Sequence, residues 1–170
     1  MQQRRRDFTQ RAGERLTIRC PSCHDHSMSK PRRSFEGQST SSASPEAVWA
    51  IWTRPDIWPG DVVASAKIDG DFVLGAKITT RVKGYTPLTS KVTRIDPPRV
   101  WTGVAKNPGL TMTIDHIIEA AESGTVITER ATMSGPFAGV AARLLGSRLE
   151  TTFKATTAHC ARLAEAQPAN

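Results

Sequence analysis

The sequence predicts an α+β fold: a seven-stranded antiparallel sheet, one long C-terminal helix, and two short helical elements after the first strand. Three observations support this. Residues 110–134, LTMTIDHIIEAAESGTVITERATMS, have the pattern of a hairpin rich in β-branched residues. Short apolar segments separated by Gly, Pro, Asn and Asp precede this hairpin from residue 62 onward. From Phe137 to Ala166 there is no proline, and apolar residues recur at helical spacing.

Residues 1–32 are predicted to be a disordered basic leader. Residues 1–33 hold nine Lys and Arg against three Asp and Glu, whereas the rest of the chain holds fourteen against thirteen. A segment with this charge and few apolar residues cannot bury a core of its own. We therefore expect the domain at residues 33–166 and a short tail at 167–170. Since the folded part lacks a basic stripe, we predict no nucleic-acid partner.

The leader also contains Cys20-Pro-Ser-Cys23-His24, which matches the attachment pattern of c-type haem and, with His26, offers four zinc ligands. Four ligands within seven residues do not form a tetrahedron alone, and no apolar export signal accompanies the haem pattern. The alternative is an unstructured leader, or upstream sequence before a start at Met28. We predict no metal and no cofactor. No segment approaches the ~18 apolar residues of a membrane span, so we expect a cytoplasmic protein with no membrane insertion.

The first strand is predicted at residues 33–42, and a helix follows it. Ser44 is the expected N-cap, and Pro45 suits the first helical turn. This helix ends at Arg54-Pro55 and buries one apolar side, formed by Val48, Ile51 and Trp52. Trp58-Pro59-Gly60 is predicted to be a loop or a second short helical turn.

Four strands are then expected at residues 62–68, 75–83, 88–95 and 99–106, each bounded by turn residues. In the second of these, Ile78 and Thr80 alternate with Lys77 and Thr79. One face of the sheet is therefore expected to be covered and the other to face solvent.

The hairpin at residues 110–134 has a strongly specified register. A tight turn at Glu122-Ser123 would make three apolar cross-strand pairs: Ile118 with Ile127, Ile114 with Ala131, and Met112 with Met133. The same register places His116 opposite Glu129, an ionisable pair in an otherwise apolar row.

The final helix shows a change of phase at Gly146, where we predict a kink or break. One apolar stripe precedes it: Phe137, Val140, Ala141, Leu144 and Leu145. A second stripe follows and is predicted to pack across the sheet: Leu149, Phe153, Thr156, Cys160 and Leu163. Cys160 is expected to be a small buried hydrophobe, and His159 to lie on the outer side of the helix.

The strings SPEAVWAIWTRPDIWP, DGDFVLG, RIDPPRVWTG and GTVITERATMSGPFAG, in this order along the chain, resemble the helix-grip superfamily. That superfamily includes the START domains, the birch-pollen allergen type and the bacterial polyketide cyclase/dehydrase group. The resemblance covers about residues 33–166 and implies a strongly curved sheet wrapped around the final helix. It also implies an apolar cavity for a lipid-like, steroid-like or polyketide-like molecule. It carries over no catalytic set, because the superfamily has no invariant one.

The candidate ligand-binding residues come from the covered face of the sheet and the second helix stripe: Ile78, Thr80, Trp101, Met112, Ile114, His116, Glu129, Ala131, Met133, Leu149 and Phe153. The aliphatic residues among them would equally fill a core, since cavities are lined mostly by such residues. A buried Trp101 needs a partner for its indole N–H. His116 and Glu129 are the candidate catalytic residues; they would move a proton, bind the polar end of a ligand, or form a satisfied structural pair.

Two functions are compatible with this sequence. The first is binding of a hydrophobic small molecule, by a monomer or homodimer. The second is a polyketide cyclase/dehydrase-type enzyme that uses the His116–Glu129 pair for proton transfer. A partner-binding co-chaperone is disfavoured, because the sequence indicates no exposed apolar patch.

Overall fold

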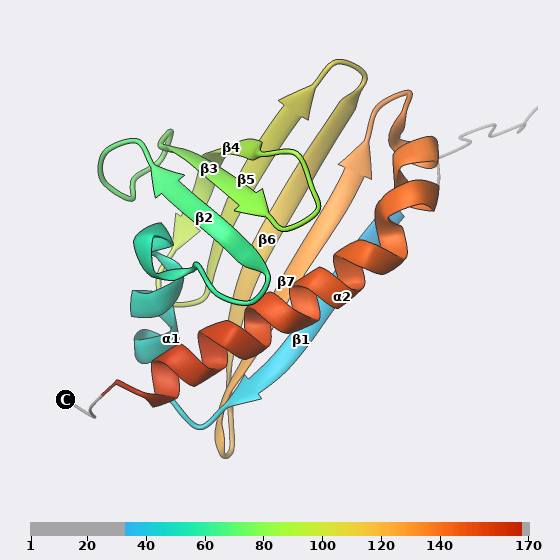
Figure 1. Cartoon of the computed structure of the whole chain (residues 1–170). Helices are drawn as coiled ribbons and strands as arrows, with labels where there is room; N and C mark the ends of the chain where they lie inside the picture. The colour runs from blue at the N-terminus through green and yellow to red at the C-terminus, as the bar shows by residue number, and fades with distance from the viewer. Residues whose placement is uncertain (1–32, 168–170) are drawn as a thin grey trace, which may run out of the picture. The chain divides into compact units, whose positions relative to one another are not determined.

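Seven antiparallel strands form one sheet in the order β1-β7-β6-β5-β4-β3-β2 in the computed structural model, which describes residues 33–167. The elements in chain order are β1 (Arg33–Ser41), α1 (Pro45–Trp52), the 3-10 helix η1 (Pro55–Ile57), β2 (Val63–Ile68), β3 (Lys77–Val82), β4 (Leu88–Asp96), β5 (Val100–Asn107), β6 (Leu110–Ala121), β7 (Gly124–Ser134) and α2 (Ala138–Glu165). The sheet is curled, and α2 runs diagonally across one of its faces (Figure 1). The predicted fold class is confirmed.

The start of α1 follows the sequence prediction closely. Ser44 is the N-cap, and its side chain accepts a hydrogen bond from the Ala47 amide, while Pro45 occupies the first helical turn. The second helical element lies at Pro55–Ile57, before the Trp58-Pro59-Gly60 segment considered for it. Pro55 explains the position, because its fixed φ suits the first residue of a helical turn.

The predicted register of the last hairpin is confirmed. Strands β6 and β7 pair Ile118 with Ile127 and Met112 with Met133, and the turn closes between Ala121 and Gly124. Strand β1 then pairs with β7 along its whole length, from Arg33 opposite Met133 to Ser41 opposite Thr125. The leader and its cysteine and histidine motif lie outside the described residues.

Of the kink or break predicted at Gly146, the break is wrong, because α2 is one continuous helix of 28 residues. Its first turns are inclined to the rest (Figure 1). Gly146 is buried against β1, and a Cβ atom there would overlap the ring of Phe35. The glycine therefore marks a close approach of the helix to the sheet, not the end of a helix.

The first apolar stripe of α2 is largely exposed, contrary to the expectation that the surface carries no apolar patch. Phe137, Val140 and Leu144 are 60%, 61% and 69% exposed. The small residues Ala138, Ala142 and Gly146 occupy the buried side instead. Small side chains allow the helix backbone to approach the sheet closely, and this turns the larger apolar residues outward.

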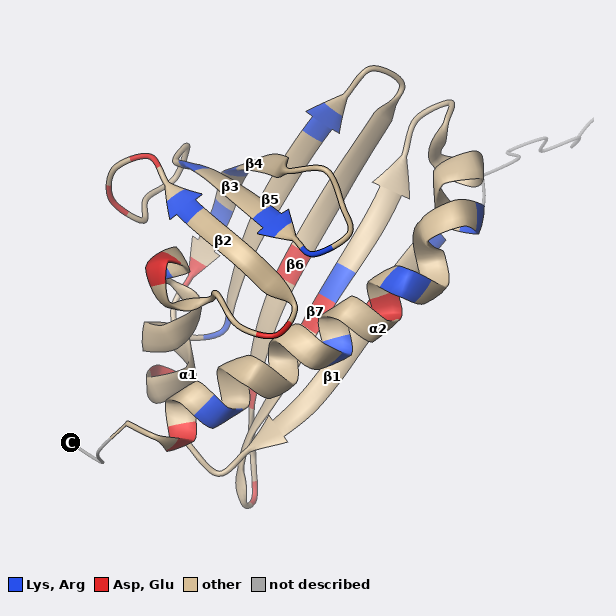
Figure 2. Ribbon diagram, viewed as in Figure 1, with Lys and Arg blue, Asp and Glu red and all other residues tan. Residues whose placement is uncertain are grey.

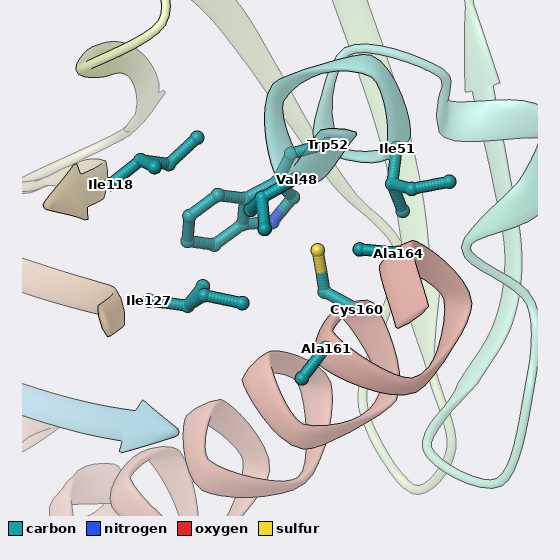
Figure 3. Close-up of a cluster of buried hydrophobic side chains, with 8 residues drawn as sticks. All are labelled: Val48, Ile51, Trp52, Ile118, Ile127, Cys160, Ala161 and Ala164. Carbon is teal, nitrogen blue, oxygen red and sulfur yellow. The ribbon is translucent and has the colours of Figure 1, made fainter. Parts of the chain in front are cut away.

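Helix α1 packs between the hairpin and the last turns of α2 (Figure 3). There Val48, Ile51 and Trp52 meet Cys160 and the β6 and β7 side chains Ile118 and Ile127. Burial raises the pKa of the Cys160 thiol to about 12, with a further contribution from the charge of Glu129. Cys160 is therefore protonated, and it is a small buried side chain as predicted.

Candidate functional site

A cavity of about 500 Å³ lies between the sheet and α2. Its walls come from α1, the segment before β2, strands β2 to β7, the β3–β4 turn and one side of α2, and they are mostly apolar. The structure places ten of the sequence-predicted residues on these walls: Ile78, Thr80, Trp101, Met112, Ile114, His116, Glu129, Met133, Leu149 and Phe153.

Ala131 is the predicted residue that does not line the cavity. It is fully buried and belongs to the core cluster in which Met133 of β7 packs against Ala142 and Phe153 of α2. At this point of β7 the helix covers the strand directly, so no space remains beside the small Ala131 side chain.

A row of polar and aromatic side chains crosses three neighbouring strands. Trp101 of β5 pairs with His116 of β6, and His116 pairs with Glu129 of β7. Because directly opposite residues project from the same face of a sheet, these three side chains lie side by side. The Trp101 and His116 rings are stacked, with centroids 3.5 Å apart and an interplanar angle of 7°.

Two more tryptophans surround His116. The Trp52 ring meets it edge-on at a centroid distance of 5.0 Å, and the Trp58 ring lies 6.5 Å away at an interplanar angle of 21°. Trp52 comes from α1, and Trp58 from the segment after η1. His116 is thereby surrounded by three aromatic rings, which offer no counter-charge.

This enclosure keeps the imidazole neutral. Burial lowers the pKa of His116 to about 3, and the nearby carbonyl groups of Trp101 and Ile114 offset only part of that shift. His116 Nε2 lies 3.7 Å from Glu129 Oε1, which is longer than a hydrogen bond. At neutral pH the two residues are therefore neighbours in the cavity wall and not an ion pair, so the interpretation as a satisfied structural pair is not supported.

Glu129 has the opposite shift. Its side chain is 12% exposed, and burial raises the pKa of its carboxyl group to about 7. A hydrogen bond that the Thr156 hydroxyl donates to Glu129 Oε2 lowers this pKa and limits the shift. The carboxyl group is therefore able to donate or accept a proton near neutral pH.

Four buried polar side-chain atoms in the described part of the chain have no hydrogen-bond partner: Tyr85 Oη, Trp101 Nε1, His116 Nδ1 and His159 Nε2. All four residues line the cavity. Most buried polar groups in proteins are hydrogen-bonded. These four unpaired atoms give the cavity wall polar groups at several separate points.

Sequence reasoning missed several residues of these walls, including Thr156, Tyr85 and Trp58. It also misplaced His159, which lines the cavity and does not lie on the outer side of α2. A Cβ atom at Gly60 would be 2.8 Å from His159 Cε1, so the histidine packs on the segment before β2. Thr156 could have been found, because it lies in the predicted stripe one turn from Phe153. The positions of Tyr85 and Trp58 depend on loop conformation.

Within residues 33–167, no group of three or more His, Cys, Asp or Glu side chains is placed to hold a metal ion. In the same part of the chain no helix combines the length and the hydropathy needed to cross a membrane.

A curled antiparallel sheet that a long C-terminal helix covers, with an apolar cavity between them, defines the helix-grip class of proteins. The model of one family in this class, described as polyketide cyclase / dehydrase and lipid transport, matches residues 32–165. The chain belongs to this family.

Solved structures show the same fold at low sequence identity. Norcoclaurine synthase from Thalictrum flavum, in complex with dopamine and hydroxybenzaldehyde, is 12% identical with a TM-score of 0.63, over 82% of this chain and 90% of that one. The polyketide cyclase-like protein Cgl2372 from Corynebacterium glutamicum is 21% identical with a TM-score of 0.51, over 80% and 93%. The di-domain ARO/CYC protein BexL of the BE-7585A biosynthetic pathway is 22% identical with a TM-score of 0.59, over 81% of this chain and 51% of that one. Among curated proteins no sequence matches this chain.

Proposed function

We propose that the protein binds a hydrophobic small molecule, of lipid-, steroid- or polyketide-like character, in the cavity between the sheet and α2. The observation that carries the proposal is the cavity itself, about 500 Å³ with mostly apolar walls. Ligand sites for small molecules have volumes of about 300–1,000 Å³ and this kind of lining. The family, whose description includes lipid transport, supports the same proposal.

The polar row suggests what one end of the ligand carries. The Trp101 indole donates a hydrogen bond, the neutral His116 imidazole donates or accepts one, and Glu129 does either according to its protonation state. No cationic side chain belongs to this row, and charge is costly in such surroundings. The ligand is therefore expected to bring a hydroxyl or carbonyl group to this point and not a strongly charged one.

The test uses a neutral apolar dye, N-phenyl-1-naphthylamine, whose fluorescence rises in apolar surroundings. We expect saturable binding of one dye per chain. Ala158 of α2 lines the cavity, so Ala158→Phe should fill part of the space and weaken binding by about tenfold, as expected for the loss of roughly 1.4 kcal/mol of contact. Ala120→Phe makes the same change at an exposed position of β6 and should bind as the wild type does. Binding without saturation, or equal loss in both variants, would contradict the proposal.

Catalysis is the second candidate, and the position of Glu129 favours it. A carboxyl group with a pKa of about 7 in a cavity wall suits general acid–base chemistry near neutral pH. His116, with its pKa of about 3, is a weak base, so Glu129 would carry the proton transfer while His116 would orient a carbonyl substrate. The solved relative BexL is an ARO/CYC protein by its description, which agrees with a polyketide-like substrate.

One incubation separates the two functions. A polyketide-like carbonyl compound is added to the protein, and the cavity contents are analysed by native mass spectrometry. Recovery of the unmodified compound supports carriage. A changed mass that Glu129→Gln abolishes, while dye binding persists, supports catalysis.

A further inference from the structure

The exposed side of the first half of α2 carries three large apolar residues. Phe137, Val140 and Leu144 are 60%, 61% and 69% exposed, and their spacing of three and four residues places them on one side of the helix. We call them the α2 apolar stripe. Within residues 33–167, the other large apolar side chains with comparable exposure are Val73 and Leu74, in the loop before β3.

The stripe adjoins one end of the cavity. The Phe137 amide donates a hydrogen bond of 3.0 Å to the Gly109 carbonyl in the β5–β6 turn, and the Phe137 ring lies against Gly109. Leu110, next in the chain, lines the cavity, as does Leu145 of α2. The β5–β6 turn and the start of α2 therefore meet beside the same end of the cavity.

The β3–β4 turn completes this end. Tyr85 lines the cavity there, and the Arg148 guanidinium of α2 lies 5.9 Å from the centroid of its ring. Strand β4 begins at Leu88 at the same end of the sheet at which β5 finishes, since Lys91 pairs with Val104. We call the group of the β3–β4 turn, the β5–β6 turn and the start of α2 the cavity rim.

The rim is basic. Residues 82–88, 104–113 and 131–149 contain no Asp or Glu. They contain four exposed cationic residues: Lys83, Lys106, Arg143 and Arg148. Figure 2 shows basic residues on the start of α2 and at the end of β5, whereas acidic residues mark the loop between β2 and β3 and the turn between β6 and β7.

We propose that the cavity rim docks on an anionic lipid surface, with the α2 apolar stripe in the headgroup region and the four cationic side chains against lipid phosphates. An amphipathic helix segment with large apolar residues on one side and basic residues beside them has the chemistry of such peripheral contacts. The docking needs no membrane-spanning segment.

Two other occupants fit less well. A second copy of the chain would need about 800 Å² of surface on each partner, whereas even an aromatic side chain offers only about 150–250 Å². Three partly exposed side chains are too few for that area. The basic leader is attached nearby, because β1 begins at Arg33 opposite Met133, but it has the same sign of charge as the rim. An anionic surface attracts both.

The experiment measures sedimentation of the full-length protein with vesicles of phosphatidylcholine, alone or mixed in equal parts with phosphatidylglycerol. Leu144→Glu places a charge in the stripe. Leu74→Glu makes the same change at a residue that is 63% exposed, in the loop at the other end of β3. We expect the wild type and Leu74→Glu to bind the mixed vesicles equally, and Leu144→Glu to bind about tenfold less, because its side chain no longer enters the lipid.

Controls distinguish the alternatives. Leu144→Glu should keep the wild-type melting temperature, since Leu144 is exposed, and Arg143→Gln should weaken binding to the mixed vesicles without loss of fold. Equal vesicle binding by the wild type and both glutamate variants would assign the binding to the leader and overturn the proposal. So would equal binding to neutral and mixed vesicles. A dimer that Leu144→Glu alone dissociates, with vesicle binding unchanged, would assign the stripe to a second copy.

Discussion

Glu129 couples the protonation of the cavity wall to the stability of the fold. Its pKa is about 7 in the folded chain and about 4.5 when the side chain is fully solvated. Between these values the folded chain keeps a proton that the unfolded chain releases, so stability falls as pH rises through this window and stays low above it. His116 acts in the opposite direction: its pKa falls from 6.5 to about 3, so stability falls as pH decreases below 6.5. Where the two windows overlap, the effects partly cancel.

Glu129→Gln removes the contribution of Glu129 to the pH dependence of stability, because the amide does not ionise. The difference in free energy of unfolding between the variant and the wild type should grow in favour of the variant by on the order of 2–3 kcal/mol as pH rises from 4.5 to 8. Urea denaturation at several pH values measures this difference. Glu150→Gln, at an exposed position of α2, serves as the control and should follow the wild-type profile. A Glu129→Gln difference that stays constant with pH would contradict the raised pKa.

Strand β1 and helix α2 cross with their backbones in contact at Gly37. A Cβ atom there would overlap the backbone of Phe153 and Lys154, which cannot move aside as the end of a flexible side chain would. Gly37 also lies opposite Glu129, the last member of the polar row. The missing side chain therefore sets the distance between α2 and the sheet at the point where Thr156 reaches the carboxyl group.

Gly37→Ala should separate α2 from β1 and destabilise the protein by about 1–3 kcal/mol, the usual cost of overpacking. Gly139→Ala is the matched control, because a Cβ atom at that position of α2 meets nothing within 4 Å. That variant should gain about 0.5–1 kcal/mol from helix propensity. Thermal and urea unfolding of both variants measure the difference. Similar effects of the two changes would show that the crossing tolerates a side chain.

The elements that follow local rules could be predicted from the sequence. The β6–β7 register followed from the period of its apolar residues and one tight turn, and the start of α1 followed from its cap at Ser44. The orientation of α2 could not be predicted, because hydrophobicity favours burial of Phe137 and Leu144, whereas close packing of Ala138, Ala142 and Gly146 decides the buried side. His159 was placed on the wrong side of the helix, although it lies three residues after Thr156 and four before Leu163 of the predicted stripe.

Some features of the candidate site could likewise be predicted from the sequence, and others could not. Residues on the concave face of the strands followed from alternation, and the pairing of His116 with Glu129 followed from the register of the hairpin. The position of Trp101 opposite His116 did not, because the sequence does not define the register between β5 and β6. The pKa values of that row could not, because they depend on burial by Trp52 and Trp58 from distant segments. Sequence also suggested a charged His–Glu pair as readily as a neutral one, and only the enclosure of His116 distinguishes them.

At the scale of the molecule, α2 supports the two halves of the sheet unequally. It packs mainly against β1, β7 and α1, whereas strands β2, β3 and β4 stand on the other side of the cavity. Strand β2 is an edge strand, and its pairing with β3 has an irregularity between Val63 and Ser65. The second half of the sheet is therefore held chiefly by its own ladder of hydrogen bonds.

This asymmetry has a consequence for the rates at which backbone amides exchange with deuterium. Protection reflects the free energy of local opening, which is lower where fewer apolar contacts support the strand. Peptides that cover residues 63–92 should therefore take up deuterium earlier than those that cover residues 33–41 and 125–134, as followed by mass spectrometry. A ligand in the cavity should slow deuterium uptake in residues 63–92 more than in residues 33–41 and 125–134. The reason is that the ligand would supply the packing that α2 does not give to β2, β3 and β4. Equal protection of both groups would show that the sheet opens as one cooperative unit.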